Sequence, residues 1–332
     1  MERGSGAGDG WVSQMDTPSA RVKFSVVIAT FDRPAELTRC MRAIAELRYP
    51  RNEFEVIVVN DGGPRDHLDR LTDLVGDIHL KIVSTPNAGP GAARNAGAAV
   101  ARGEFLAFID DDCVPPPDWL IKLSSAVEQH PDALIGGHTL NALTGNLFSQ
   151  ASQTLVDYVY AYYNEPGARR NMFFASNNMT LSADAFRAMG GFDEAFRTAE
   201  DRELCNRWWA SGGEFRYLPE IVMNHAHRLN LLSLHRQHFG YGRGALPYWQ
   251  KSGSGGVRGI NVEPFSFYVR MLGFPFKKGD RFPAIVSALI LFSQVSNAAG
   301  FAYEGMRRVF ARERAPILAS KTRPNEGVAG TS

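Results

Sequence analysis

The feature that most constrains this chain is a series of short apolar runs that alternate with segments of helical periodicity. The runs are rich in Val, Ile, Leu and Phe, and they occupy residues 23–30, 54–61, 80–83 and 105–110. Runs without polar alternation are typical of strands buried on both faces of a parallel sheet. The pattern therefore predicts an α/β fold with a doubly wound, Rossmann-like and mostly parallel sheet flanked by helices.

Helical periodicity begins after Pro34, where apolar residues recur three or four positions apart. Further helices are predicted at residues 69–74, 89–101, 119–128, 183–189 and 200–211. Extended segments are predicted at 171–181 and, as edge segments, at 215–218 and 222–225. Residues 141–170 contain aromatic side chains at mixed spacing and give no clear period.

The 332 residues suffice for one large α/β domain with a C-terminal extension. We expect a Gly- and Ser-rich disordered lead-in without a signal peptide, a main domain, a C-terminal helical region and a polar flexible tail. The corresponding ranges are 1–22, 23–230, 231–311 and 312–332.

Residues 282–303 carry no charge and are flanked by Arg281 and by Arg307 and Arg308. A segment of about 20 residues reaches the minimum length for crossing a bilayer. This one also contains Ser, Gln, Asn and Gly, so a weak span, an interfacial helix and a buried helix all stay open. If the segment meets a membrane, its composition favours lying on the surface over spanning.

The charge and cysteine content narrow the choice of partner and compartment. The net charge is +1, so no global field attracts nucleic acid. Three widely spaced cysteines form neither a disulfide framework nor a zinc pattern. We expect reduced thiols in the cytoplasm, with the protein either free there or peripheral on the inner face of the plasma membrane.

Polar residues follow the predicted strands, at the carboxyl ends where doubly wound sheets bind ligands. They are Thr30, Asp61 and the run Asp110-Asp111-Asp112. Three adjacent carboxylates repel one another, so their burial calls for a cation, and their hard oxygen atoms suit Mg²⁺ or Mn²⁺. In an extended segment Asp110 and Asp112 would point to the same side. The alternative interpretation is an exposed acidic turn.

Three further segments are candidates for a site. Residues 87–95 begin a helix with small residues, where free amides and Arg94 could bind phosphate or simply form a tight helix cap. Glu200 and Asp201 open a helix, either as a favourable charge at its start or as a source of a general base. His225 and His227 alternate after an extended segment, which would put both imidazoles on one side, as metal ligands or as structural residues.

Six segments in a fixed order resemble the family 2 glycosyltransferases with the GT-A fold. The resemblance covers roughly residues 24–227, and its segments are 26–34, 56–62, 87–95, 108–112, 190–194 and 200–204. Ala29 stands where the family usually has Pro. The Gln-X-X-Arg-Trp motif of processive polysaccharide synthases is not found, which argues for a non-processive enzyme.

The resemblance implies roles for individual residues. Those of the nucleotide pocket would be Thr30, Phe31, Arg33, Asp61, which reads the base, Arg94 and Asp111. Asp110 and Asp112 match the acids of the Asp-X-Asp motif, for the ribose and the metal respectively. Asp201 matches the catalytic base. His225 or His227 matches a third metal contact of some members.

Together these observations predict an inverting, metal-dependent transfer of a sugar from a nucleoside-diphosphate sugar to a hydroxyl acceptor. The acceptor would be a glycan or a lipid-linked molecule in bacterial polysaccharide or glycoconjugate synthesis. One alternative is a nucleotidyltransferase acting on a sugar phosphate, which would need a Gly-rich basic loop near the chain start, where residues 29–34 offer only Arg33. Another is a non-catalytic membrane-surface protein, which would leave the acidic run unexplained.

Overall fold

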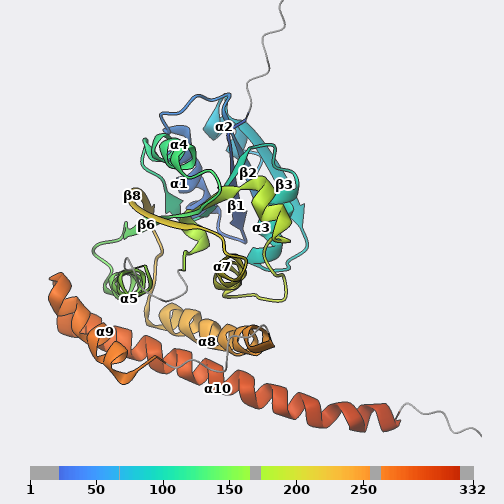
Figure 1. Ribbon diagram of the computed structural model, residues 1–332, viewed down its shortest axis with the longest axis vertical. Helices are drawn as coiled ribbons and strands as arrows, with labels where there is room; N and C mark the ends of the chain where they lie inside the picture. The colour runs from blue at the N-terminus through green and yellow to red at the C-terminus, as the bar shows by residue number, and fades with distance from the viewer. Residues whose placement is uncertain (1–21, 67, 165–172, 255–262, 322–332) are drawn as a thin grey trace, which may run out of the picture.

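The computed structural model describes residues 22–66, 68–164, 173–254 and 263–321, and it confirms the predicted α/β fold with C-terminal helices (Figure 1). Most of the predicted lead-in, residues 1–21, lies outside the described residues, as do residues 322–332. The last helix runs to Lys321, so the expected start of the tail at residue 312 falls inside that helix.

Among the described residues, eight strands form one sheet in the order β3-β2-β1-β4-β7-β6-β8-β5. Their bounds are β1 Phe24–Thr30, β2 Phe54–Asp61, β3 His79–Thr85, β4 Phe105–Asp110, β5 Cys113–Val114, β6 Leu134–Asn141, β7 Met179–Ser182 and β8 Phe215–His225. Strands β1 to β4 are parallel, whereas β7 runs antiparallel to both of its neighbours. The mostly parallel half is therefore the N-terminal half, as the apolar runs predicted.

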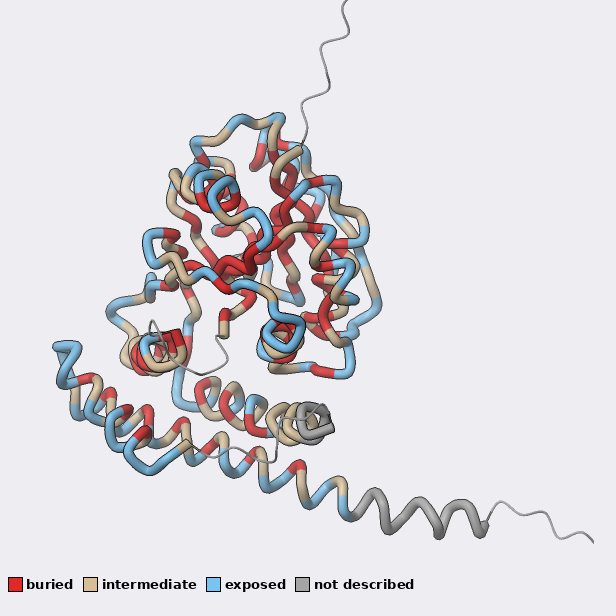
Figure 2. The backbone as a smooth tube through the Cα atoms, viewed as in Figure 1, coloured by how far each residue is buried: buried red, intermediate tan, exposed pale blue. Residues whose placement is uncertain are grey.

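Strand β1 is buried on both faces, which explains its lack of alternation. Val26 packs into the cluster of apolar side chains beneath helices α1 and α4, and Val27 packs into the opposite cluster against α3, α6 and α7. Both side chains are fully buried. Figure 2 shows the buried strands as the centre of the upper body.

Helices cover both faces of the sheet and extend the molecule below it (Figure 1). Their bounds are α1 Pro34–Ala45, α2 Leu71–Val75, α3 Pro90–Ala99, α4 Trp119–Gln129, α5 Leu147–Tyr163, α6 Ala183–Ala188, α7 Glu200–Ala210, α8 Leu231–Ser254, α9 Phe265–Lys278 and α10 Pro283–Lys321. A short 3-10 helix, Ser176–Asn178, precedes β7.

The C-terminal half departs most from the sequence prediction. Residues 215–218 and 222–225 form the single strand β8, which lies between β6 and β5 and is not at an edge. The predicted strand at 171–181 is a strand only from Met179, and residues 171–172 lie outside the described part. Strand β6 was not predicted because Gly136 and Gly137 interrupt its apolar pattern. An added Cβ at Gly136 would meet the Phe174 ring at 2.2 Å, so that ring fills the space.

Helices α8 and α10 approach each other through glycines. A Cβ added at Gly242 would lie 1.9 Å from the carbonyl oxygen of Asn297, and one at Gly300 would lie 2.0 Å from that of Phe239. No side chain fits at either position, so the two backbones are in direct contact. Helices α5, α9 and α10 share a third apolar cluster, which includes Tyr158, Phe267 and Val286. The C-terminal helices are thus packed against the main domain.

One face of α10 is buried in this packing, and the other is apolar and exposed. Within Pro283–Val309 the most apolar window has a mean hydropathy of 1.6 and only 28% of it is buried, so by length and composition the helix could cross a membrane. Its exposed apolar side chains include Ile285, Leu291, Val295 and Met306. The segment predicted from the sequence is therefore a helix that packs on the main domain through one face and exposes apolar side chains on another.

Candidate active site

A cavity of about 1190 Å³ opens at the carboxyl edge of the parallel strands. All eleven residues singled out from the sequence line it: Thr30, Phe31, Arg33, Asp61, Arg94, Asp110, Asp111, Asp112, Asp201, His225 and His227. The register explains part of this convergence, because Thr30 pairs with Asn60 and Ala29 pairs with Asp110 across neighbouring strands. Further walls come from α5, α8, α9 and α10.

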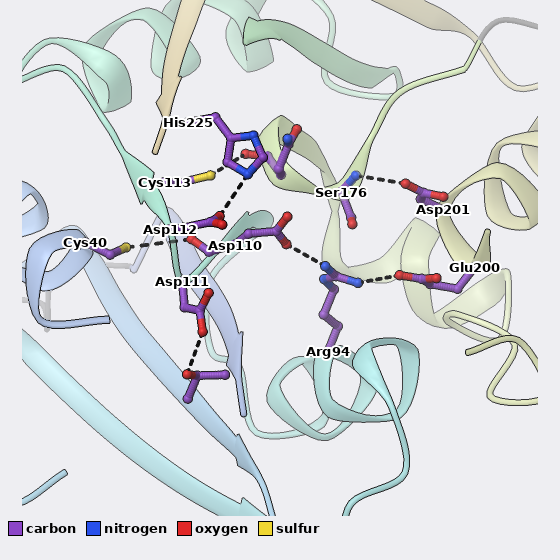
Figure 3. A network of polar contacts seen from close by, with 12 residues as sticks. Cys40, Arg94, Asp110, Asp111, Asp112, Cys113, Ser176, Glu200, Asp201 and His225 are labelled. Atoms are coloured by element: carbon purple, nitrogen blue, oxygen red, sulfur yellow. Dashed lines mark hydrogen bonds and ion pairs between the residues drawn. The ribbon is translucent and has the colours of Figure 1, made fainter. Parts of the chain in front are cut away.

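The three consecutive carboxylates have different partners, and Asp111 points away from Asp110 and Asp112 (Figure 3). Strand β4 ends at Asp110 and the chain turns at residues 111–112, so the extended backbone assumed for this run ends two residues early. Asp110 pairs with Arg94, and Asp111 accepts a hydrogen bond from Thr30 Oγ1 at 2.7 Å. Asp112 has different partners, Arg33 and His225, although both Asp110 and Asp112 line the cavity.

Arg33 links two of these acids. Its guanidinium nitrogens lie 2.7 Å from Asp111 Oδ1 and 2.6 Å from Asp112 Oδ2. Burial raises the pKa of Asp111 to about 7, although Arg33 and Thr30 oppose this shift. Arg33 therefore neutralises part of a buried negative charge that would otherwise be costly.

Asp112 also lies beside two imidazoles. Its Oδ1 atom is 2.9 Å from His225 Nε2, and one ligand atom each from Asp112, His225 and His227 lies within 4.8 Å of the others. That oxygen is buried and has no well-aligned hydrogen-bond donor among the described residues. The rings of His225 and His227 are 5.2 Å apart, as their alternation predicted. A buried carboxylate oxygen beside two imidazoles is a set of ligand atoms that fits a bound divalent cation.

The electrostatics of this group favour ionised Asp112. Burial opposes ionisation, but His225 and Arg33 hold the pKa of Asp112 below its usual range. Burial likewise disfavours protonation of His225, but the neighbouring carboxylate raises the pKa of that imidazole. Burial lowers the pKa of His227 to about 4, so this ring is neutral and free to use a lone pair near pH 7.

Arg94 joins the end of β4 to the start of α7. It is 4% exposed, and its nitrogens lie 2.6 Å from Asp110 Oδ1 and 2.7 Å from Glu200 Oε1. Its guanidinium also lies 5.7 Å from the centre of the Phe192 ring. Glu200 is the partner that the sequence did not reveal, because 106 positions separate it from Arg94.

Asp201 occupies the first turn of α7 and faces the same cavity. Its carboxylate accepts hydrogen bonds from the amide of its neighbour Arg202 at 2.7 Å and, more weakly, from the Ser176 amide at 3.4 Å. Burial and the adjacent Glu200 raise its pKa to about 7, against the opposing effect of Arg94. A carboxylate with this pKa can accept a proton near neutral pH.

Two backbone conformations mark the same region. Asp32 and Ala199 are the non-glycine residues with positive φ in the described ranges, at 51° and 69°. Each directly precedes a charged residue of the site, Arg33 or Glu200. This conformation costs about 1–2 kcal/mol for a residue with a Cβ, and such strain is often found at functional sites.

Asp61 has a different environment from the other acids. Its two carboxylate oxygens accept hydrogen bonds from the amides of Ala88 at 2.8 Å and Gly89 at 2.9 Å. It thereby holds the loop that leads into α3, beside the cavity. Its predicted role in reading a base stays a prediction.

Comparison with solved structures and known sequences identifies the fold and the family of this chain. The mannosyltransferase PcManGT from Pyrobaculum calidifontis, in complex with GDP-Man and Mn²⁺, matches 90% of this chain and 82% of its own, with a TM-score of 0.56 and 16% identity. At this identity the likeness concerns the fold, and it defines the chain as a GT-A-fold protein. Residues 25–190 match the model of Glycosyl transferase family 2, which is half of the chain. The chain therefore belongs to glycosyl transferase family 2.

Two relatives illustrate the range of this family. The pre-mycofactocin glycosyltransferase of Mycobacterium tuberculosis is 28% identical over 228 residues, which cover 67% of this chain and 47% of the relative. The glucosyl-dolichyl phosphate glucuronosyltransferase of Haloferax volcanii is 26% identical over 225 residues, which cover 63% of this chain and 69% of the relative. The chain thus spans about half the length of the mycobacterial relative.

Replacing Arg94 with Met should destabilise the fold, because it leaves the carboxylates of Asp110 and Glu200 without their shared cation. We expect a loss of about 3 kcal/mol in the free energy of unfolding, measured by urea denaturation. The control is Arg187→Met, which breaks an exposed pair with Asp184 and should cost at most about 1 kcal/mol. Equal losses in the two variants would contradict this role of Arg94.

Proposed function

We propose that this protein is an inverting, metal-dependent and non-processive glycosyltransferase. It transfers a sugar from a nucleoside-diphosphate sugar to a hydroxyl of a glycan or lipid-linked acceptor, in polysaccharide or glycoconjugate synthesis of the bacterial type. One observation carries the proposal: a carboxylate with a pKa near 7, Asp201, faces the same cavity as the cluster of Asp112, His225 and His227.

The donor would lie along the carboxyl edge of the parallel strands. Phe31 is 51% exposed in the cavity wall and offers an aromatic surface to a base. Asp110 keeps about a third of its side chain exposed and could accept a hydrogen bond from a ribose hydroxyl. PcManGT, which shares the fold, is in complex with GDP-Man, and this supports a nucleoside-diphosphate sugar as donor.

The cation would be held by Asp112, His225 and His227. Bound there, it would supply positive charge that neutralises the diphosphate leaving group. Two imidazole nitrogens suit a transition metal better than Mg²⁺, so this set of ligands favours Mn²⁺. The Mn²⁺ in the PcManGT complex agrees with this choice.

The chain's own residues then account for the proton and the stereochemistry. Asp201 takes the proton from the acceptor hydroxyl, whose oxygen forms a bond to the anomeric carbon as the bond to the diphosphate breaks. Attack from the face opposite the diphosphate inverts the configuration in one displacement, and the nucleoside diphosphate leaves. No enzyme nucleophile is required, so one base suffices.

The alternative of a nucleotidyltransferase is less well supported. A triphosphate substrate calls for free cationic side chains near the start of the chain, and Arg33 is already paired with Asp111 and Asp112. Arg94 is likewise buried between two carboxylates. The carboxylate Asp201, held apart from the metal cluster, has no evident task in nucleotidyl transfer.

We also propose that the protein binds the inner face of the plasma membrane through α10. Its exposed apolar face lies between cationic ends. Arg281 precedes the helix, and after the apolar stretch Arg243, Arg307 and Arg308 surround the single carboxylate of Glu304. An apolar stripe with surplus positive charge is suited to an anionic lipid surface.

Asp201→Asn should lower the rate of transfer by at least about a hundredfold while donor binding persists, because the amide cannot take the proton. In the unchanged protein the rate should rise as the pH increases through about 7, where the Asp201 carboxyl loses its proton. The rate is measured with labelled UDP-, GDP- and dTDP-sugars. Asp184→Asn, at an exposed position, is the control. A near-normal rate in Asp201→Asn would show that the base is wrongly assigned.

Nucleoside diphosphates should raise the melting temperature more with Mn²⁺ than with chelator. Binding at 100 times Kd adds about 2.7 kcal/mol of stability. Asp112→Ala should lose the part of the shift that depends on Mn²⁺, whereas Asp118→Ala, which removes an exposed carboxylate, should keep it. A full shift in chelator, or one unaffected by Asp112→Ala, would contradict the metal site.

The full chain should sediment with vesicles of phosphatidylglycerol and phosphatidylcholine, and less with phosphatidylcholine alone. Leu291→Asp should weaken this binding at least about tenfold, since it removes a leucine from the apolar face. Ile121→Asp changes an equally exposed apolar residue of α4 and should leave binding unchanged. Equal binding by both variants would exclude α10 as the membrane contact.

A further inference from the structure

The walls of the cavity change from polar to apolar along its length. Helix α5 contributes Ser149, Ser152 and Gln153 from its first turns, and Leu155, Val159 and Tyr163 from its later turns. The polar end lies at the metal cluster, because Ser149 Oγ donates a hydrogen bond to the carbonyl oxygen of His227 at 2.6 Å. The apolar end therefore leads away from the predicted cation.

Helix α8 shows the same change in polarity. Gln237 and His238 line the cavity near the start of the helix, and Ala245, Tyr248 and Trp249 line it two to three turns later. His238 is 4% exposed, and its Nε2 atom has no hydrogen-bond partner among the residues that the structure describes. A buried imidazole nitrogen without a partner calls for a polar group of a ligand.

Helices α9 and α10 complete the apolar part with Phe267, Met271, Val295 and Phe301. Val295 belongs to the cavity wall and is also 60% exposed, so the wall reaches the exposed apolar face of α10. Glu263 borders this part as well, where its carboxylate accepts hydrogen bonds from the hydroxyls of two tyrosines, at 2.8 and 2.7 Å. These two hydrogen bonds stabilise the Glu263 carboxylate within the cavity wall.

The predicted base lies where the two parts meet. The Tyr160 hydroxyl of α5 accepts a hydrogen bond from the Ala175 amide at 2.7 Å, and the next amide, that of Ser176, donates to Asp201. Val159 and Tyr163 flank Tyr160 on α5 and line the apolar part. A hydroxyl at Asp201 can therefore belong to a molecule that continues into apolar surroundings.

From this arrangement we infer that the acceptor is lipid-linked, with its single hydrocarbon chain in the part of the cavity walled by α5, α8, α9 and α10. The polar head lies between His238 and Asp201, and the chain leaves along Val295 toward the face of α10 proposed to meet the membrane. A water-soluble glycan would leave these apolar walls in contact with water and would gain little from them. The inference rests on the proposed function and names its acceptor.

Alkyl glucosides with methyl, hexyl and octyl chains, below their micelle concentrations, test this site in the full chain. Affinity is measured from tryptophan fluorescence, since Trp249 lines the cavity. We expect about a tenfold gain in affinity from hexyl to octyl, because each buried methylene contributes about threefold to fourfold. Equal affinities along the series would overturn the inference and favour a water-soluble acceptor.

Two neighbouring alanines of α10 provide matched variants. Ala298 lines the cavity and Ala299 does not, and both are exposed. In Ala298→Trp, affinity should no longer increase with the length of the alkyl chain. In Ala299→Trp, which adds the same indole to the same helix, affinity should still increase with that length. Val159→Phe narrows the opposite wall and should also reduce the gain. An unchanged gain in both Ala298→Trp and Val159→Phe would overturn the inference.

Two further measurements separate this inference from the other proposals. Leu291→Asp removes apolar area from the outer face of α10, and in this variant affinity should still increase with the length of the alkyl chain. If the increase were lost in Leu291→Asp, the hydrocarbon chain would lie outside the cavity and the inference would be overturned. The nucleotide-induced rise in melting temperature is recorded for the unchanged protein in the same buffer. Its absence would count against the donor site of the proposed function, whereas the glucoside series reports on the hydrocarbon chain alone.

Discussion

The structure depends on how four acids at one edge of the sheet are neutralised. Asp110, Asp111 and Asp112 follow one another in sequence, and Glu200 joins them from α7. Burying such charges is costly unless each has a partner, and the partners come from other elements. Arg33 follows β1 and Arg94 belongs to α3, so charge compensation fastens strands β1 and β4 to helices α3 and α7. The same pairs bring the start of α7, and with it Asp201, to the edge where a donor would bind.

The sequence predicted the N-terminal half of the fold well, and it predicted which residues would meet at one edge of the sheet, because its signals are local. Continuous apolar runs identify buried strands, and the residues that end those strands must meet at one edge of a parallel sheet. The apolar wall of the cavity could not be predicted in this way. Part of it comes from α5, whose aromatic side chains serve both the cavity and the packing against α9, so no single period results. The pairing of Arg94 with Glu200 was equally hidden, since nothing local connects them.

The proposed donor site and the proposed acceptor site are built from different parts of the chain. The family model covers residues 25–190, which include the strands β1 to β7, the acids that end β4 and the whole of α5. Asp201, the two histidines and helices α8 to α10 lie beyond it. The donor end is therefore built mostly from the segment that the family shares, and much of the acceptor end from the residues after position 190.

The glycine crossing of α8 and α10 has a consequence for geometry. Gly242 and Gly300 put backbone against backbone, and at these two positions no side chain separates the helices. Close backbone contact of this kind restricts tilting and sliding of one helix against the other. The position of α10 therefore determines the position of α8. If α10 rests on a bilayer, this crossing determines the distance between the lipid surface and the carboxylates of the candidate active site.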